Sequence, residues 1–325
     1  MTLGRHGPSE PNGAGGVAAE PPAGPGAPLR RVLSRLPLHV AIIGFAAVWL
    51  IPTFALLVSS FRDPSAIAAT GWWEAIRSPF DFTLGNYDEV LSQRNMARAF
   101  RNSLIITVPS TILIIVVASF AAYAFAWMQF PGRDGLFLVV IALLVVPLQM
   151  TLIPILRLYT DLRVEEVPFI GGELPFIGGG VFGTGSFSAM WLAHTAYGLP
   201  FAVFLLRNFF GGLPRDLFES AYIDGASDVR VFFRIVLPLS IPAIASLTIF
   251  QFLWVWNDLL VALVYLGDPS LFPMTVQIQS LVSSFGTNYQ VLTSAAFISM
   301  LLPLAVFFAL QRYFVQGILA GAVKG

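Results

Sequence analysis

The sequence predicts an all-α, polytopic membrane protein with six transmembrane helices. Hydrophobic residues make up 56% of the chain and charged residues only 11%. The mean hydropathy of +0.77 lies outside the range of soluble domains. A helix needs about 20 apolar residues to cross a bilayer. Six apolar runs are long enough, and they lie at 38–60, 103–128, 136–159, 187–210, 236–263 and 291–310.

The chain before the first apolar run is predicted to be a disordered tail, at 1–36. As far as residue 28 it is rich in glycine, proline and alanine and has scarcely any large apolar side chain. Such a segment cannot bury enough apolar surface to offset the entropy lost on folding. The remaining residues, 37–325, are predicted to form the six-helix membrane domain.

The distribution of basic residues predicts the orientation of the helices. Arginine and lysine concentrate in the tail, the loop around Arg133, segment 213–238 and the C-terminus. Loop 161–186, in contrast, is acidic, and loop 267–290 has no arginine or lysine. Short basic loops stay in the cytoplasm, so both termini are predicted to be cytoplasmic. Loop 61–100 then lies outside. It contains four arginines, but long translocated loops follow the rule poorly.

Composition also excludes several kinds of chemistry. With 18 basic and 18 acidic residues the net charge is zero, so nothing favours nucleic acid as a partner. The chain has no cysteine, which excludes disulfides, cysteine-bound zinc and iron–sulfur clusters. A phosphate-binding loop needs Gly-Lys followed by Ser or Thr, and the only lysine, Lys324, lies between Val323 and Gly325. We therefore expect no cofactor and no ATPase site in this chain.

Segment 213–238 is the best-charged stretch between two apolar runs, and it predicts a helix, a turn and a second helix. Pro214 fits a first helical position, and Asp216 in the first turn suits the positive end of the helix dipole. Gly225 is expected to end this helix with a positive φ, and Ser227 to cap the next one.

Two interpretations of this segment remain open from the residues alone. Small residues such as Ser220, Ala221 and Ala226 would let the backbone of a partner approach, and Glu219 offers a charge for a partner arginine. The alternative is an amphipathic helix on the membrane surface, which needs no partner. The helical spacing of the residues does not decide between a surface for a partner and a helix that lies on the membrane.

Polar residues inside apolar runs point to a possible solute pathway, because hydrocarbon excludes them unless they face protein or water. The candidates are Gln149, Gln251, Trp254 and Asn257. Aromatic faces beside amide groups suit a sugar, whose ring has an apolar face and a rim of hydroxyls. For the three amides, hydrogen bonding between helices is an equally open alternative, and Trp254 is open between pathway and interface.

Three other residues in or near the apolar runs favour ordinary structural roles. Trp256 is expected to be an anchor at the membrane interface, where tryptophan is common. His194 is expected to be a satisfied packing residue and not a proton carrier. Asp258 is expected near the outer end of its helix, where a solvated charge is ordinary.

Segment 213–238 resembles the EAA loop of ATP-binding-cassette (ABC) importer permeases, whose usual form is Glu-Ala-Ala, three residues, Gly, then Ile-x-Leu-Pro. The matching residues are Glu219, Ser220, Ala221, Asp224, Gly225, Ala226, Leu237 and Pro238. Ser220 replaces the middle alanine, which is a change between small residues. Further matches at 130–133, 256–258 and 311–325 extend over nearly the whole chain after the tail. Together they resemble the MalG-type subunit of carbohydrate importers, which has the type I (MetI/MalG-like) permease fold.

The resemblance implies a multi-pass subunit of the bacterial plasma membrane that forms half of a translocation path for a sugar or oligosaccharide. It also implies a second, MalF-like permease, two cytoplasmic ATP-binding subunits and an extracytoplasmic solute-binding protein as partners, within membrane lipid. Segment 213–238 would couple to an ATPase, with Glu219 meeting a basic residue and Gly225 setting the turn. Lys324 in the C-terminal tail would reach toward the ATPases.

Three rival functions are weighed against this one. An ABC permease for an amino acid or peptide is the nearest. A secondary transporter would need ionisable residues deep in several helices, and Asp258 is the main candidate. An intramembrane metalloprotease would need a His-Glu-x-x-His run, which none of the three histidines provides, so we expect no enzyme.

Overall fold

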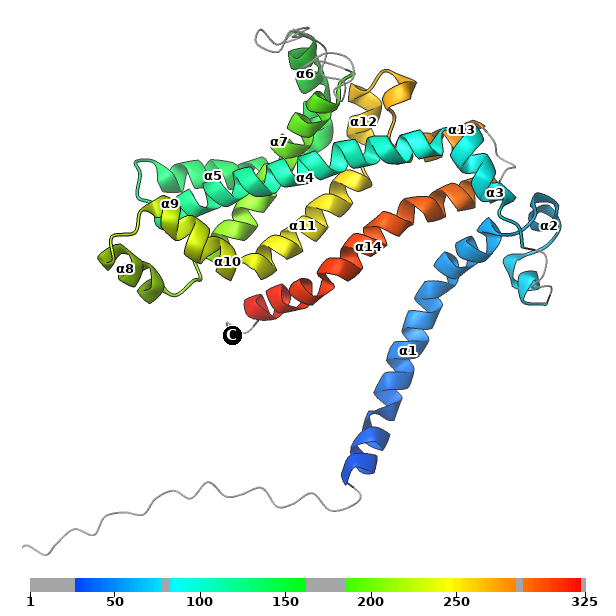
Figure 1. The fold of residues 1–325 in the computed structure, drawn as a ribbon, viewed down its shortest axis with the longest axis horizontal. Helices are drawn as coiled ribbons and strands as arrows, with labels where there is room; N and C mark the ends of the chain where they lie inside the picture. The colour runs from blue at the N-terminus through cyan, green and yellow to red at the C-terminus, as the bar shows by residue number, and fades with distance from the viewer. Residues whose placement is uncertain (1–26, 78–81, 162–184, 285–288, 323–325) are drawn as a thin grey trace, which may run out of the picture. The chain divides into compact units, whose positions relative to one another are not determined.

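The computed structural model describes residues 27–77, 82–161, 185–284 and 289–322 (Figure 1). These residues are helical apart from turns, loops and one isolated antiparallel bridge between Arg62 and Phe82. Four helices are long and apolar enough to cross a membrane, or up to six if each of two bent helix pairs is one span. The prediction of an all-α protein with six spans agrees with this architecture. The chain divides into two compact units, with the boundary after Phe54.

Helix α1, Ala27–Ser60, provides the described part of the first unit. Residues 27–36 are helical, so the prediction of disorder is wrong there, and residues 1–26 lie outside the described residues. Most large apolar side chains of the helix from residue 36 onward are exposed, among them Ile43, Phe45 and Trp49. Exposed apolar surface of this extent needs lipid or another protein to cover it.

The core of the second unit consists of long helices packed side by side (Figure 1). They are α4 (Met96–Trp127), α7 (Phe187–Phe210), α11 (Ile241–Trp256) and α14 (Tyr289–Ala322). Small residues line the contact surfaces of these helices and let the backbones approach closely. Examples that are fully or almost fully buried are Ala118, Ala122, Ala193, Ala202 and Ala295.

The predicted run 136–159 forms two helices instead of one. Helix α5, Arg133–Leu143, and helix α6, Leu148–Asp161, meet at 103°. Pro147 lies in the break, where its missing N–H costs no helical hydrogen bond. Sequence hydropathy shows no such bend because both arms are apolar.

The predicted run 236–263 is also broken, into α10 (Leu237–Leu239), α11 and α12 (Leu260–Tyr265). The helical segment that ends at Leu239 meets α11 at 74°. The break between α11 and α12 is stabilised by Asp258, whose carboxylate accepts hydrogen bonds from the backbone N–H of Val261 and Ala262 at 3.2 and 3.1 Å. Asp258 therefore caps α12.

Shorter elements join the long helices. They are α2 (Pro64–Ala69), η1 (Trp72–Ile76), α3 (Gly85–Asp88) and η2 (Glu89–Gln93) before α4, and η4 (Pro269–Leu271) and α13 (Met274–Ser284) before α14. Helix α4 extends from α3 and α13 at one end of the second unit to α8 and α9 at the other (Figure 1). Helix α4 therefore connects the region next to α8 with the opposite end of the second unit.

Candidate functional site

Segment 213–238 folds as the predicted helix, turn and helix, made of α8 (Arg215–Ile223), α9 (Asp228–Val231) and the π-helical turn η3 (Phe232–Val236). Pro214, which was predicted at the first helical position, is instead the N-cap residue, and α8 begins one residue later at Arg215. The expected cap of α9 is confirmed, because the Ser227 hydroxyl accepts a hydrogen bond from the Arg230 N–H.

Gly225 closes α8, as predicted, with a φ of 76°. The Gly225 N–H donates to the Tyr222 carbonyl, and the Ala226 N–H to the Ala221 carbonyl, at 3.0 and 2.9 Å. This pattern ends a helix by satisfying its last carbonyls. A Cβ at Gly225 would meet no atom within 4 Å, so the requirement for glycine is conformational and not steric.

A buried aromatic residue, Phe218, packs α8 against the core helices of the second unit. Phe218 is 2% exposed, and its ring stacks on the indole of Trp127, at the end of α4. The Trp127 Nε1–H in turn donates to the carbonyl of Phe210, at the end of α7. Trp127 was not identified from the sequence. An aromatic residue at the last position of a long apolar helix is a signal that could have indicated it.

The other residues of α8 are exposed or half-buried. Glu219, Ser220, Asp224 and Gly225 are exposed, and Ala221 and Ala226 are half-buried. No hydrogen bond or ion pair of the Glu219 side chain occurs among the described residues. The predicted coupling residues of α8 therefore form a continuous surface that contacts little of this chain.

A hydrogen bond ties α8 to α9. The Tyr222 hydroxyl donates to Asp228 Oδ1 at 2.7 Å and lies 3.4 Å from the Tyr123 hydroxyl of α4. Burial raises the pKa of Tyr222, and the hydrogen bond to Asp228 raises it further. The phenol consequently stays protonated at neutral pH and keeps the two helices joined.

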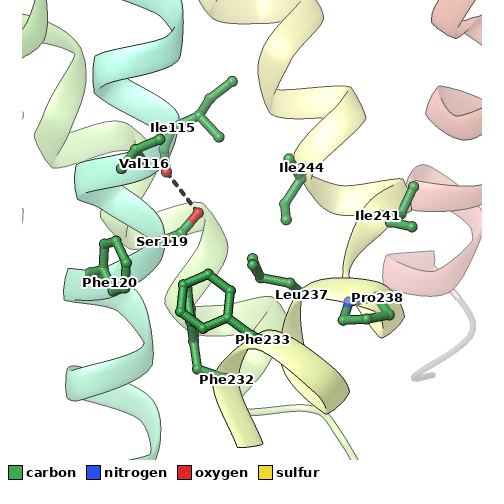
Figure 2. Close-up of a pocket in the computed structure, with 10 residues that line it drawn as sticks. All are labelled: Ile115, Val116, Ser119, Phe120, Phe232, Phe233, Leu237, Pro238, Ile241 and Ile244. Carbon is green, nitrogen blue, oxygen red and sulfur yellow. Dashed lines mark hydrogen bonds between the residues drawn. The ribbon is translucent and has the colours of Figure 1, made fainter. Parts of the chain in front are cut away.

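Leu237 and Pro238, the last two predicted coupling residues, line an apolar cleft (Figure 2). The cleft has a volume of about 630 Å³ and lies between α4 and the segment from η3 to α11. In Figure 2, Leu237 points toward the side of α4 that carries Ser119. On the same side of the segment, Phe232 stacks on Phe120 with ring centroids 4.8 Å apart. The second half of segment 213–238 is thus anchored to α4 by aromatic packing.

The pathway candidates fall into two groups. Gln251 and Trp254 line one cleft of about 280 Å³ between α7 and α11, together with Tyr197, Gly198, Phe201 and Phe250. Gln149 on α6 and Asn257 at the end of α11 are exposed and do not line it. The Asn257 amide donates to the Leu253 carbonyl in its own helix.

The cleft between α7 and α11 has the features of a ligand site. Trp254 is 41% exposed, whereas Gln251 is 3% exposed. The Gln251 Nε2 donates to the Gly198 carbonyl at 3.3 Å, and its Oε1 is buried without a hydrogen-bond partner. A Cβ at Gly198 would lie 2.9 Å from that Oε1. An aromatic face beside a buried, unsatisfied amide oxygen offers one apolar and one polar contact to a ligand.

The structure corrects two predictions near this cleft. Trp256 is 3% exposed, stacks on Phe252 and donates to the Ser299 carbonyl at 3.0 Å, so it is a packing residue and not an interfacial anchor. His194 is buried as predicted, but neither ring nitrogen has a hydrogen-bond partner. Its Nε2 instead lies 3.7 Å from Asp258 Oδ2. The rings of Trp254 and His194 meet edge to face, with centroids 5.6 Å apart.

Two further predictions concern the C-terminus and metals. Lys324 lies outside the described residues. Among the residues that the structure describes, no three His, Asp or Glu side chains come together as a metal-binding group.

Comparisons with known proteins agree with this architecture. Residues 114–320 match the family described as binding-protein-dependent transport system inner membrane component. The osmoprotective compounds uptake permease protein of Synechocystis sp. is 52% identical, over 89% of this chain and 92% of the relative. The α-glucoside transport system permease protein of Rhizobium meliloti is 39% identical, over 92% of this chain and 99% of the relative.

A solved structure has the same fold. It is a bacterial ABC transporter involved in the import of the acidic polysaccharide alginate, with a TM-score of 0.66 and 19% sequence identity. The match covers 88% of this chain and 98% of that chain. By the family match over residues 114–320 and by these two relatives, the chain belongs to the binding-protein-dependent transport system inner membrane components.

Proposed function

We propose that this chain is the permease subunit of an ABC importer for a sugar or oligosaccharide, and that it forms half of the translocation path. Membership of the family supports the importer class. The name of the Rhizobium relative supports a glycoside as the solute. The chain itself makes and breaks no bond. ATP is hydrolysed by partner subunits, because the sequence lacks a phosphate-binding loop.

The observation that carries this proposal is the geometry of α8. One buried residue, Phe218, joins the helix to α4, while the surface with Glu219, Ser220 and Asp224 is open. A helix that is held on one side and free on the other can receive a partner and pass its displacement on. We infer that a cytoplasmic ATPase subunit occupies the open side, with one of its basic residues at Glu219.

The full assembly in this proposal contains a second, MalF-like permease, two ATP-binding subunits and an extracytoplasmic solute-binding protein. The family description names dependence on a binding protein. The exposed apolar side chains of α1 suit a membrane environment shared between lipid and a second permease. Both termini then lie in the cytoplasm of a bacterial cell, and the C-terminal segment with Lys324 faces the ATPases.

The solute passes the cleft between α7 and α11 in this proposal. The Trp254 ring would stack on the apolar face of a sugar ring, and the free Gln251 Oε1 would accept a hydrogen bond from a hydroxyl. Gln149 and Asn257 lie outside this cleft, so we assign them to other parts of the path.

The test is transport by the purified complex in proteoliposomes. We expect uptake of a radiolabelled α-glucoside or related oligosaccharide that requires ATP inside the vesicle and the soluble binding protein outside. A panel of amino acids and peptides is the matched control for solute class. Uptake of sugar by this chain alone, without a nucleotide-hydrolysing subunit, would overturn the proposal.

One observation favours a second candidate, a proton-driven transporter. His194 and Asp258 approach within 3.7 Å between α7 and the break before α12, and ionisable pairs inside membranes often mark proton paths. Asp258, however, already caps α12, which gives it a structural role. Uptake driven by an imposed pH gradient in vesicles without ATP would favour this candidate.

A further inference from the structure

A polar cleft lies beside α8, between this helix, the connection from α4 to α5 and the end of α7. Its volume is about 610 Å³. The aromatic pair Trp127 and Phe218 lines part of it, and the rest is mostly polar. It shares no lining residue with the apolar cleft at Leu237 or with the cleft at Gln251.

The charge in this cleft is strongly positive. Arg133 from α5, Arg207 from α7 and Arg215 from α8 line it, against a single carboxylate, Glu219. Three separate elements therefore each contribute an arginine to the lining of one cleft. Like charges in one cleft repel, and a bound anion would offset that repulsion.

Little within the described residues neutralises these arginines. Arg133 pairs with Asp134 at 3.0 Å, but the Asp134 side chain is 86% exposed, and such surface pairs contribute little. Neither Arg207 nor Arg215 forms an ion pair among the described residues, and the Nε of Arg207 is buried without a hydrogen-bond acceptor. Two of the three arginines also form hydrogen bonds within the chain. The Arg207 Nη1 donates to Asn208 Oδ1 at 3.4 Å, and the Arg133 Nη1 donates to the Met128 carbonyl at 3.3 Å. These two arginines therefore keep only part of their donors for a ligand, whereas the Arg215 guanidinium has no hydrogen bond within the described residues.

The guanidinium of Arg207 is held in a fixed orientation. Its Cζ lies 4.8 Å from the centre of the Phe137 ring, a cation–π contact that restricts the side chain. The planar fork of an arginine matches two oxygens of a phosphate group. Arg207 is thus pre-organised to bind an oxyanion that enters this cleft.

The surface next to the cleft identifies the source of the phosphate. Helix α5 begins at Arg133 and continues with the exposed apolar residues Leu136, Leu138 and Val139. A ligand that carries both a phosphate and hydrocarbon chains would satisfy the cleft and this surface together. Basic pockets at the ends of transmembrane helices are known to suit anionic lipid headgroups.

We propose that Arg133, Arg207 and Arg215 bind the phosphate of an anionic phospholipid, whose acyl chains lie along α5. The bound headgroup joins Arg215 on the coupling helix to Arg207 on the core helix α7. The attachment of α8 then depends on the lipid as well as on the stack between Trp127 and Phe218. This property goes beyond the proposed import function and does not depend on it.

Native mass spectrometry of the purified protein, with the subunits that co-purify with it, tests the proposal. The protein is exchanged into mixed micelles that contain phosphatidylglycerol or zwitterionic phosphatidylcholine. We expect selective retention of phosphatidylglycerol. We expect Arg215→Gln, and separately Arg207→Gln, to weaken it about tenfold each, as for the loss of one charge-assisted hydrogen bond. Arg215 is exposed, so its variant should fold even if the Arg207 variant does not.

Arg230→Gln is the matched control, because Arg230 is exposed on α9 and does not line the cleft. Retention that is unchanged in both cleft variants, or that falls equally in the control, overturns the proposal. A second arm titrates inorganic phosphate into protein in phosphatidylcholine nanodiscs. If inorganic phosphate binds as tightly as phosphatidylglycerol in this arm and loses its binding in the same variants, the ligand is a soluble phosphate. That result would also overturn the lipid proposal.

Discussion

The ring of Phe218 in α8 lies face to face with the indole of Trp127 in α4, with centroids 3.6 Å apart and planes 16° apart. Trp127 also donates its Nε1–H to the Phe210 carbonyl of α7 at 3.0 Å. A displacement of α8 therefore reaches two core helices through one aromatic pair. Because α4 extends to the opposite end of the unit (Figure 1), the pair is well placed to pass a displacement of α8 to that end.

Replacing Phe218 by alanine tests this relationship. Loss of a buried phenylalanine costs about 3–5 kcal/mol in the free energy of unfolding, and here the loss would detach α8 locally. We expect ATP-dependent uptake to fall about 5- to 150-fold, the range for a coupling energy of about 1–3 kcal/mol, while ATP hydrolysis persists. Leu217→Ala is the control, because Leu217 is the neighbouring apolar residue on α8 and is exposed. Equal loss of uptake and hydrolysis would show that the stack only stabilises the complex.

Gly225→Ala tests the turn between α8 and α9. The positive φ of 76° costs a residue with a Cβ about 1–2 kcal/mol, although the added methyl group meets no neighbour. We expect lower thermal stability of the coupling segment and reduced uptake, and a stronger effect for Gly225→Pro. Gly135→Ala is the matched control. Gly135 lies inside α5 with open space around it, and alanine favours a helix by roughly 0.5–1 kcal/mol there. Thermal unfolding that responds equally to both alanine variants would contradict the conformational argument.

Glu219→Arg tests the proposed contact with an ATPase. Glu219 is exposed and its side chain has no hydrogen bond or ion pair within the described residues, but it is the only carboxylate that lines the cleft with the three arginines. We therefore expect a modest loss of thermal stability in the folded permease, from added repulsion between like charges. We expect uptake to be lost because two like charges would face each other at the interface with the ATPase. Asp88→Arg in α3 is the control for a charge reversal on an exposed residue. If the ATPase subunits co-purify in normal amount with the Glu219 variant and uptake is normal, Glu219 is not part of the contact.

The features of the fold and of the candidate site that could be predicted from the sequence are those whose cause lies within a few residues in the chain. Gly225 and Ser227 act within a few residues of their own position, so helix-capping rules predicted both the turn and the cap. The bounds of α7 were predicted as 187–210 for a similar reason, because the apolar run ends at the turn beginning with Gly211.

Long-range packing left no comparable signal. Trp256 looked like an interfacial tryptophan, but its indole donates to Ser299 on α14, a contact between residues 43 positions apart in the chain. Likewise, hydropathy gave one run at 136–159, whereas the two arms meet at 103°. The arginine cleft was missed because its members come from three segments that only the fold brings together.

Trp254→Ala tests the proposed solute cleft. The indole is 41% exposed, so its removal should leave the fold intact while the aromatic face that would stack on a sugar is lost. We expect the half-saturating concentration for uptake to rise or the maximal rate to fall about tenfold, which corresponds to about 1.4 kcal/mol. Trp73→Ala is the matched control, because Trp73 is an exposed tryptophan in η1, outside this cleft.

Gly198→Ala gives an independent test of the same cleft. Its Cβ would lie 2.8 Å from Ile114 and 2.9 Å from the Gln251 Oε1, which displaces the amide that we assign to a sugar hydroxyl. Unchanged uptake affinity and rate in both Trp254→Ala and Gly198→Ala would remove this cleft from the translocation path, since one variant deletes its apolar contact and the other displaces its polar one.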